Sequence, residues 1–199
     1  MNFDSFEYWE NRYKSDPKYF GKDWDERIKI RANTLNKFIK KYKIKKVFDY
    51  GCGDGRQSQY TIVENYFGVD ISSDAIKGCK KLNPEKQFYL AKKNDKNLKD
   101  LLKIFKPDLS LSFSVISHLI EDEIFEEYME NLFCSEKFVI IYSLDQDKKY
   151  SALYQKDRHF TKYIYENFKN WKFQEFKEEY AKDIKYGTHI YKNDKEKIL

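Results

Sequence analysis

The residues that could do chemistry begin with a cluster of glycines that follows a short apolar segment. In the stretch VFDYGCGDG, Gly51, Gly53 and Gly55 alternate with other residues directly after a predicted strand. Glycine permits a tight backbone turn and leaves no Cβ atom between the backbone and a ligand. The helix expected to begin after this turn adds unpaired backbone N–H groups. The stretch therefore predicts a site for a nucleoside-containing cofactor.

The spacing of the glycines excludes two other nucleotide-binding motifs. A GxGxxG dinucleotide motif that starts at Gly51 would need glycine at position 56, where the chain has Arg56. A P-loop would need a GK[ST] sequence, which does not follow. The remaining pattern is DxGxGxG, from Asp49 to Gly55. Asp70 lies at the end of the next predicted strand, where its carboxylate can accept hydrogen bonds from both hydroxyls of a ribose.

The elements that must position these residues alternate between strands and helices. Strands are predicted at 45–51, 66–72, 87–91, 108–116 and 137–144, and helices at 26–42, 56–64, 75–82, 97–105, 121–133 and 160–168. Two final strands, within 171–180 and 188–192, have no helix between them. The alternation predicts an α/β fold with a doubly wound, mostly parallel sheet, and the final hairpin makes one edge antiparallel.

The composition of the chain is that of one folded domain, which we expect over residues 1–199. Hydrophobic residues make up 41% and aromatic residues 18% of the chain, enough to bury a core. The first residues lack the apolar core of a secretory signal, and no apolar run approaches the roughly 18–20 residues of a membrane span. Three cysteines without CxxC spacing argue against disulfides and zinc. We therefore expect a cytoplasmic protein with no membrane contact and no metal site.

The net charge of the chain decides little about nucleic acid as a partner, but the distribution of the basic residues argues against one. The net charge of +5 comes from 38 basic and 33 acidic residues, and the lysines are scattered along the chain. The one dense basic block is KKYKIKK, residues 40–46. We interpret it as a solvated helix end followed by the start of a strand, because a nucleic-acid footprint needs basic residues gathered on one face.

Taken in order, these motifs resemble the class I S-adenosylmethionine-dependent methyltransferases. The resemblance rests on YWENRY near the amino terminus, VFDYGCGDG, YFGVDIS, DLSLSFSVISHLIEDEIFEEYM and the final hairpin. It implies a Rossmann-like sheet of seven strands. It also implies S-adenosylmethionine as the cofactor and S-adenosylhomocysteine as the product.

The resemblance assigns roles to the residues around the glycine turn. Gly51 and Gly53 are expected to line the methionine half of the cofactor, and Asp49 to face the positive end of that half. Asp70 is expected to hold the ribose. Ile71 beside it is expected to pack on the adenine. For both aspartates the alternative is a helix cap or a turn residue, which their places at strand ends disfavour.

Further cofactor contacts are expected outside this turn. In the family, the adenine is contacted from the loop that here reads AKKNDKN, so Asn94 and Asp95 are both candidates, and the sequence does not choose between them. The resemblance places Ser114 beside the sulfonium, at a position where related enzymes commonly have aspartate. Residues 1–25 are rich in aromatic side chains and are interpreted as a lid over a catalytic core of residues 26–199.

Two aromatic residues of this lid are candidate contacts with the bound molecules. Trp9 is assigned to the cofactor and Tyr13 to the acceptor. The alternative is that both only anchor the segment onto the sheet.

The residues after the fourth predicted strand bear on the methyl acceptor. SVISH replaces the [DN]PPY sequence of methyltransferases that act on adenine or amide nitrogens, and no Pro-Cys pair is present to attack cytosine. His118 is the catalytic candidate, since an ordinary pKa of about 6.5 suits it to take a proton from a hydroxyl. Arg158 and His159 are candidates for binding an anionic acceptor. The alternatives are a structural histidine, a surface arginine and a histidine at a helix entry.

These assignments predict methyl transfer to an oxygen of a small or glycan-linked anionic acceptor. The motifs are similar to those of small bacterial methyltransferases of surface-polysaccharide modification, including phosphoramidate methylation. The alternatives are a methyltransferase for RNA or a terminal phosphate, a non-catalytic cofactor-binding subunit and, more remotely, a dehydrogenase. No sizeable insertion is expected after the fifth strand, so the pocket would be open or completed by a second subunit in a homodimer.

Overall fold

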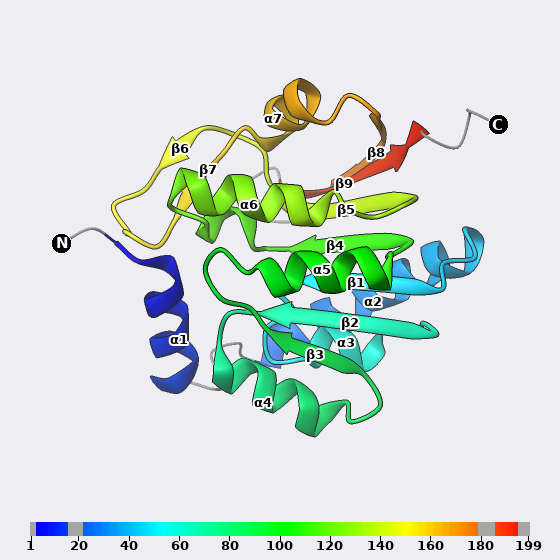
Figure 1. Ribbon diagram of the computed structural model, residues 1–199, viewed down its shortest axis with the longest axis horizontal. Helices are drawn as coiled ribbons and strands as arrows, with labels where there is room; N and C mark the ends of the chain where they lie inside the picture. The colour runs from blue at the N-terminus through cyan, green and yellow to red at the C-terminus, as the bar shows by residue number, and fades with distance from the viewer. Residues whose placement is uncertain (1–2, 16–21, 179–185, 195–199) are drawn as a thin grey trace.

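The computed structural model describes residues 3–15, 22–178 and 186–194, and a seven-stranded sheet forms their centre (Figure 1). Its strand order is β3-β2-β1-β4-β5-β9-β8. The strands are β1 (Lys46–Tyr50), β2 (Asn65–Asp70), β3 (Gln87–Leu90), β4 (Leu109–Phe113), β5 (Phe138–Leu144), β8 (Trp171–Glu178) and β9 (Tyr186–Asn193). Strands β1 to β5 are parallel, and β9 runs antiparallel to both β5 and β8. The predicted doubly wound sheet with an antiparallel terminal hairpin is confirmed.

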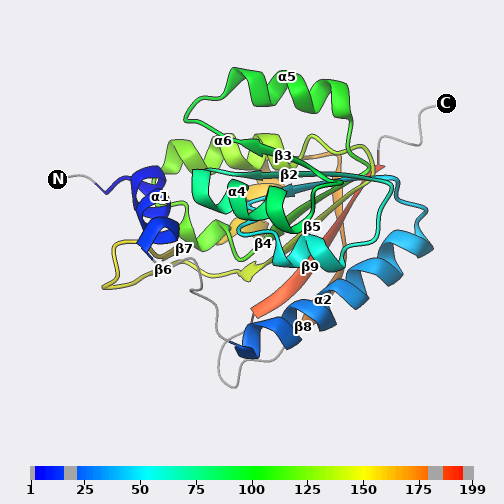
Figure 2. The ribbon, with the colours of Figure 1, turned by 90° about the horizontal axis from the view of Figure 1, so that it is seen from below.

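Helices cover both faces of this sheet. They are α1 (Ser5–Ser15), α2 (Lys22–Lys41), α3 (Arg56–Tyr60), α4 (Ser73–Leu82), α5 (Lys96–Phe105), α6 (Asp122–Leu132) and α7 (Phe160–Asn167), with one short 3₁₀ turn, η1 (Ile116–His118). Figure 2 shows α5 and α6 on one face and α2 on the other. Helix α1 lies across the end of the sheet where the parallel strands finish (Figure 1). Among the described residues, no helix combines the length and the hydropathy that crossing a bilayer requires.

The alternation of side chains along β5 explains why both faces are covered. Successive residues of a strand point to opposite faces of the sheet. Ile140 packs in one apolar cluster with Leu35 of α2, whereas Val139 and Ile141 pack in another with Met129 of α6. All of these residues are buried. A strand buried on both faces needs the continuous apolar sequence FVIIYSL that β5 has.

Three boundaries differ from the sequence prediction by more than two residues. Helix α3 ends at Tyr60, short of the expected residue 64, because Thr61 adopts an extended backbone. Strand β4 ends at Phe113, because Ser114 has the left-handed φ of 59° and η1 follows. Helix α2 already begins at Lys22, inside the expected lid.

The region after β5 also differs from the expectation. Residues 145–159, which we call the β5–α7 insert, contain a two-stranded antiparallel sheet of β6 (Lys148–Lys149) and β7 (Lys156–Asp157). The insert packs β7 against η1. The sequence analysis predicted no strand in this segment, so β6 and β7 were missed.

Stability should depend on the centre of the sheet. We expect Ile141→Ala, at a fully buried position, to lower the free energy of unfolding by about 2–5 kcal/mol, because it leaves a cavity between β5 and α6. The matched control Ile62→Ala removes a side chain that is 75% exposed. It should change the free energy of unfolding by less than about 0.5 kcal/mol. Denaturant titration measures both, and equal losses would contradict this account of the core.

Candidate functional site

A cavity of about 420 Å³ lies at the carboxyl ends of the parallel strands. Its wall contains the predicted cofactor residues Asp49, Gly51, Gly53, Asp70, Ile71 and Ser114. It also contains Trp9, Tyr13 and His118. The fold thus brings together residues from the first 13 positions and from beyond position 113. Parallel strands end at one edge of the sheet, which is why side chains so distant in sequence meet there.

The glycine turn forms one wall of this cavity. Gly51 and Gly53 have φ angles of +85° and +58°, a region that residues with a Cβ atom rarely adopt. A Cβ atom on Gly51 would collide with the side chain of Val115. One on Gly53 would lie 2.9 Å from the hydroxyl oxygen of Tyr13. The left-handed backbone therefore favours glycine at both positions, and at Gly51 the side chain of Val115 leaves no room for a Cβ atom either.

Asp70 is fixed at the end of β2 by backbone hydrogen bonds. The N–H of Gly53 donates to Oδ2 at 2.9 Å, and the N–H of Ser72 donates to Oδ1 at 3.0 Å. Burial raises the pKa of Asp70, and these two donors act in the opposite direction. A carboxylate oxygen accepts two hydrogen bonds. The backbone of Ile71 also donates to this carboxylate, so its two oxygens together keep capacity for at least one ligand hydroxyl.

Asp49 is a second buried carboxylate in the same wall, at the end of β1. The hydroxyl of Tyr66 donates to its Oδ2 atom. Burial raises the pKa of Asp49 to about 6, although the Tyr66 hydrogen bond and the charge of Arg31 lower it. A buried carboxylate with this pKa favours a positively charged group beside it, because a nearby cation stabilises the ionised form.

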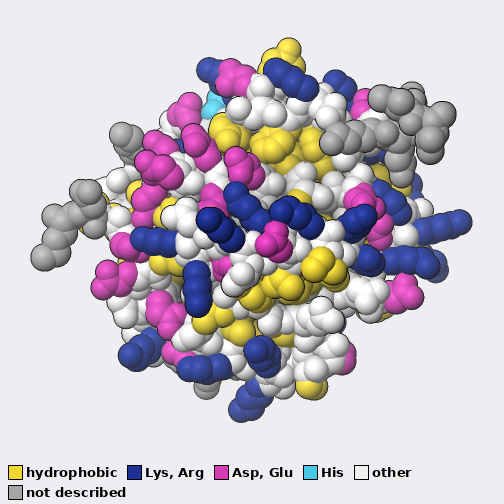
Figure 3. All heavy atoms as spheres, viewed as in Figure 1, with side chains coloured by type: hydrophobic (Ala, Val, Ile, Leu, Met, Phe, Trp, Pro, Cys, Tyr) yellow, Lys and Arg dark blue, Asp and Glu magenta, His cyan; other side chains and the backbone are white. Residues whose placement is uncertain are grey.

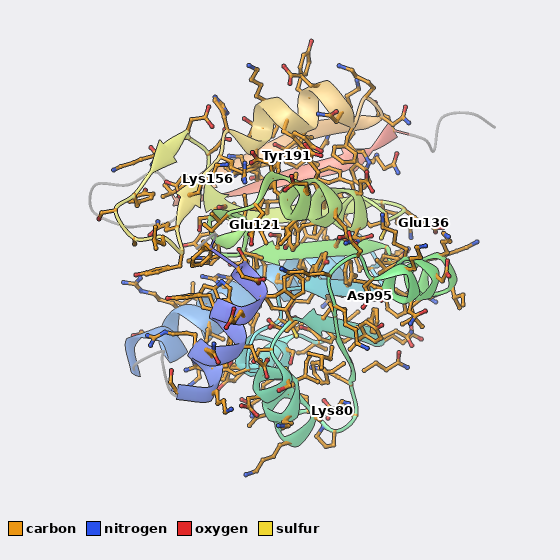
Figure 4. The ribbon with its side chains drawn as sticks, turned by 60° about the vertical axis from the view of Figure 1, so that its left-hand side comes forward. Lys80, Asp95, Glu121, Glu136, Lys156 and Tyr191 are labelled. Atoms are coloured by element: carbon orange, nitrogen blue, oxygen red, sulfur yellow. The ribbon has the colours of Figure 1, made fainter. Side chains whose placement is uncertain are left out.

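Helix α1 is fastened across the mouth of the cavity at two places. The carboxylate of Glu10 accepts hydrogen bonds from the backbone N–H of Ser73, at 2.7 Å, and from its hydroxyl. At the other end, the N–H of Ser5 donates to Oε1 of Glu121 at 2.9 Å. Figure 4 shows Glu121 beside the amino-terminal end of α1. These contacts hold Trp9, which lies between them in the sequence, in the cavity wall.

His118 belongs to η1 and lies against Trp9, with ring centroids 4.7 Å apart. Its Nδ1 atom is 3.1 Å from the carbonyl oxygen of Tyr154 in the β5–α7 insert. Because a carbonyl oxygen only accepts, Nδ1 carries the proton in this hydrogen bond and Nε2 has a free lone pair. Burial lowers the pKa of His118 below the ordinary 6.5, so the imidazole is neutral at pH 7.

Arg158 and His159, the predicted contacts for an anionic acceptor, do not line this cavity. Arg158 instead donates to the carbonyl oxygens of Leu119 and Ile120. The ring of His159 lies 3.1 Å from the Asp145 carboxylate and is half exposed. The structure therefore gives both side chains protein partners and offers no support for their proposed contact with the acceptor.

The two adenine candidates also lie outside the cavity wall. Asp95 caps the amino end of α5, where its carboxylate accepts from the N–H groups of Leu98 and Lys92. Asn94 precedes it with the left-handed φ of 52°. Lys92 is the residue of this loop that reaches the cavity.

Several polar residues of the wall were not predicted, among them Arg27, Arg31 and Gln57. Arg27 and Arg31 lie one turn apart on α2, and the Arg31 guanidinium lies 4.3 Å from the ring centroid of Tyr142. The amide of Gln57 is buried and has no hydrogen-bond partner among the described residues. For Arg27 and Arg31, the signal in the sequence was the spacing of two arginines at i and i+4 in a helix rich in lysine. Basic residues on a helix are usually solvated, so that signal is weak.

A search of the described residues for three or more His, Cys, Asp or Glu side chains that could hold a metal ion finds none. The cavity wall contains bare backbone, two buried carboxylates, aromatic side chains, a neutral histidine and the arginines of α2. Such a set can bind the sugar and the cationic end of a nucleoside derivative and can accept a proton from a second molecule.

The comparisons with solved structures agree with this architecture. An S-adenosylmethionine-dependent methyltransferase from Anabaena variabilis has a TM-score of 0.68 at 14% identity, with 96% of each chain covered. Magnesium protoporphyrin IX methyltransferase from Synechocystis, solved with bound S-adenosylmethionine, has a TM-score of 0.67 at 15% identity and covers 96% of this chain and 97% of its own. The N-methyltransferase NodS from Bradyrhizobium japonicum has a TM-score of 0.64 at 11% identity, with 86% and 97% covered.

Identities this low show a common fold and no more. A search of the curated proteins finds no match. The decisive finding is a family model, described as a methyltransferase domain, that matches residues 41–196 and hence most of the chain. The chain therefore belongs to the methyltransferase domain family and has the fold of the class I S-adenosylmethionine-dependent methyltransferases.

Proposed function

We propose that this protein transfers the methyl group of S-adenosylmethionine to an oxygen of a small or glycan-linked anionic acceptor. The observation that carries the proposal is the neutral His118, which lines the same cavity as the glycine turn and the two buried carboxylates. The family supports methyl transfer, and the histidine supports an acceptor that must lose a proton.

The cavity residues fit the cofactor. Bare backbone at Gly53 and free acceptor capacity on Asp70 suit a ribose, and Ile71 offers an apolar contact for an adenine. Asp49 suits the positively charged methionine end. The buried amide of Gln57, without a partner among the described residues, offers a further polar contact. When bound, S-adenosylmethionine supplies a methyl group that is already activated for transfer.

The protein then has to align the acceptor, exclude water and remove one proton. Trp9 on α1 covers the side of the cavity that holds His118. The Nε2 lone pair of His118 is available to take the proton of an acceptor hydroxyl, because Nδ1 is held as a donor by Tyr154. Alignment and water exclusion supply most of the rate gain in such a transfer, and a positioned base adds about 10²–10⁴-fold.

Because Arg158 and His159 lie outside the cavity, the support for an anionic acceptor comes from two arginines of α2. Arg27 and Arg31 are cationic members of the wall, and the Arg31 guanidinium is flanked by the rings of Tyr142 and Phe113. A guanidinium held in this way can bind a carboxylate or phosphate. Ser114 leaves the wall one negative charge fewer than an aspartate would. The link to surface-polysaccharide modification rests on the sequence resemblance.

The alternatives have less support. Basic and acidic side chains are interspersed on the face shown in Figure 3, which argues against an extended nucleic-acid footprint. A cofactor-binding subunit without activity would not need a neutral histidine in the cavity. Likewise α1 lines the cavity, and the β5–α7 insert contacts α1 and His118 from within the same chain, which reduces the need for a homodimer to complete the site.

The oxygen acceptor and the base can be tested together. We expect His118→Asn to lower turnover by about 10²-fold or more, because the base is lost, and to leave the affinity for S-adenosylhomocysteine within about twofold. His159→Asn, at a half-exposed position outside the cavity, is the matched control and should keep full activity. Release of S-adenosylhomocysteine would be followed over hydroxylated phosphates and carboxylates, their neutral analogues and their amine analogues. Methylation of the amines alone would contradict the proposal.

Asp70 should control cofactor affinity. Asp70→Asn keeps the size of the side chain but gives up one charged acceptor for the ribose hydroxyls, so we expect about 10-fold to 100-fold weaker binding of S-adenosylhomocysteine. Asp74→Asn, four residues later on the surface of α4, is the control and should bind normally. Isothermal titration calorimetry gives both constants. Wild-type affinity in Asp70→Asn would remove the ribose assignment.

Asp49 should make cofactor binding depend on pH. Its pKa of about 6 means that it is ionised at pH 8 and protonated at pH 5, and only the ionised form attracts the positive methionine end. We expect the affinity for S-adenosylhomocysteine to be steady above about pH 7 and to fall below pH 6 by up to roughly tenfold per unit. Asp49→Asn should bind more weakly at pH 8 and lose the step near pH 6. A wild-type curve without that step would refute the role of Asp49.

A further inference from the structure

The β5–α7 insert lies against the segment that carries His118. Its hairpin is closed by the buried Asp157, whose Oδ2 atom accepts hydrogen bonds from Gln146, at 2.9 Å, and from Tyr150. Strand β7 of this hairpin packs on η1. The ring of Tyr154 also stacks on Tyr8 of α1, with centroids 5.1 Å apart. The insert therefore joins the two elements that cover the acceptor side of the cavity.

Arg158, the last residue but one of this insert, binds the segment after His118. Its Nη2 atom donates to the carbonyl oxygens of Leu119 at 3.0 Å and Ile120 at 2.9 Å, and its Nε atom donates to Leu119 at 3.3 Å. Nη1 pairs with the carboxylate of Asp122, and the guanidinium lies over the ring of Phe125. Residues 119 and 120 belong to no helix or strand, so no regular hydrogen-bond ladder fixes these carbonyl groups.

The same insert determines the protonation pattern of His118. The Tyr154 carbonyl accepts the hydrogen bond of Nδ1 at 3.1 Å, which selects the tautomer with Nε2 unprotonated. That hydrogen bond forms only while the carbonyl group of Tyr154 and the imidazole of His118 keep their relative positions. Arg158 is the side chain that bonds the insert to the residues immediately after His118.

We propose that Arg158 is a positioning residue, which locks the His118 segment onto the β5–α7 insert and so holds His118 in the tautomer with a free Nε2 lone pair. The planar guanidinium suits this task, because one rigid group reaches two carbonyl oxygens and a carboxylate together. The inference rests on the proposed function in one respect: the catalytic value of the tautomer depends on His118 being the base.

Lys156 provides a matched control on the neighbouring strand. Its ammonium group also pairs with Asp122, at 2.7 Å, but the hydrogen bonds to the carbonyl groups at 119 and 120 come from Arg158. Figure 4 shows Lys156 and Glu121 on the same side of the molecule. Loss of Lys156 therefore removes a cation from the same carboxylate while the carbonyl contacts remain.

The test is the tautomer of His118 in the full chain with ¹⁵N-labelled histidine. The chain has three histidines, so long-range ¹H–¹⁵N spectra assign His118 by comparison with His118→Asn. We expect the wild type and Lys156→Gln to show one tautomer, protonated at Nδ1. Arg158→Gln should show a mixture of both tautomers, with the affinity for S-adenosylhomocysteine within about twofold of the wild type.

A folded Arg158→Gln variant that keeps the single wild-type tautomer would overturn the proposal, and so would a mixture in Lys156→Gln. If Arg158→Gln does not fold, Arg158→Lys takes its place, since it keeps the charge beside Asp122 and Phe125 but cannot reproduce the planar fork. It too should show the mixture, and a wild-type spectrum would overturn the proposal. Full activity of His118→Asn would instead refute the proposed base and leave the positioning result intact.

Discussion

The hydrogen bond from the Gly53 N–H to Asp70 is the contact on which the site depends. It joins the turn after β1 to the end of β2, and so sets the distance between bare backbone and buried carboxylate. Both partners need the parallel pairing of β1 with β2 to meet. The cost of burying the carboxylate is offset by two backbone donors, which a ligand hydroxyl can supplement.

The acceptor side of the cavity is built differently, because loops and a helix from outside the sheet supply it. Helix α1 comes from before the first strand and the β5–α7 insert from after the fifth, and they meet where Tyr8 stacks on Tyr154. His118 lies under this contact, against Trp9 and the Tyr154 carbonyl. In the proposed function, the methyl donor therefore binds at the end of the sheet, whereas α1 and the insert hold the surroundings of His118 in place.

The fold could be predicted from the sequence, because strand and helix periodicity are local signals with direct physical meaning. The glycine spacing and Asp70 likewise indicated one cavity at the strand ends, and Asp49 and His118, singled out from the sequence, line that cavity too. The partners of Arg158 could not be predicted, because Leu119 and Ile120 bind it through backbone carbonyl oxygens, which every residue has. Asp95 was ambiguous because a helix cap and a ligand contact need the same carboxylate.

The attachment of α1 has a consequence for how such a protein can diversify. In this helix only Ser5 is fully buried, so the helix adds little to the core, yet it contributes Trp9 and Tyr13 to the cavity wall. Substitutions at Trp9 or Tyr13 would therefore change the shape of the cavity without altering the apolar clusters between the sheet and its covering helices. In the proposed function, α1 can therefore change during evolution to accept new methyl acceptors, while the glycine turn and Asp70 are retained.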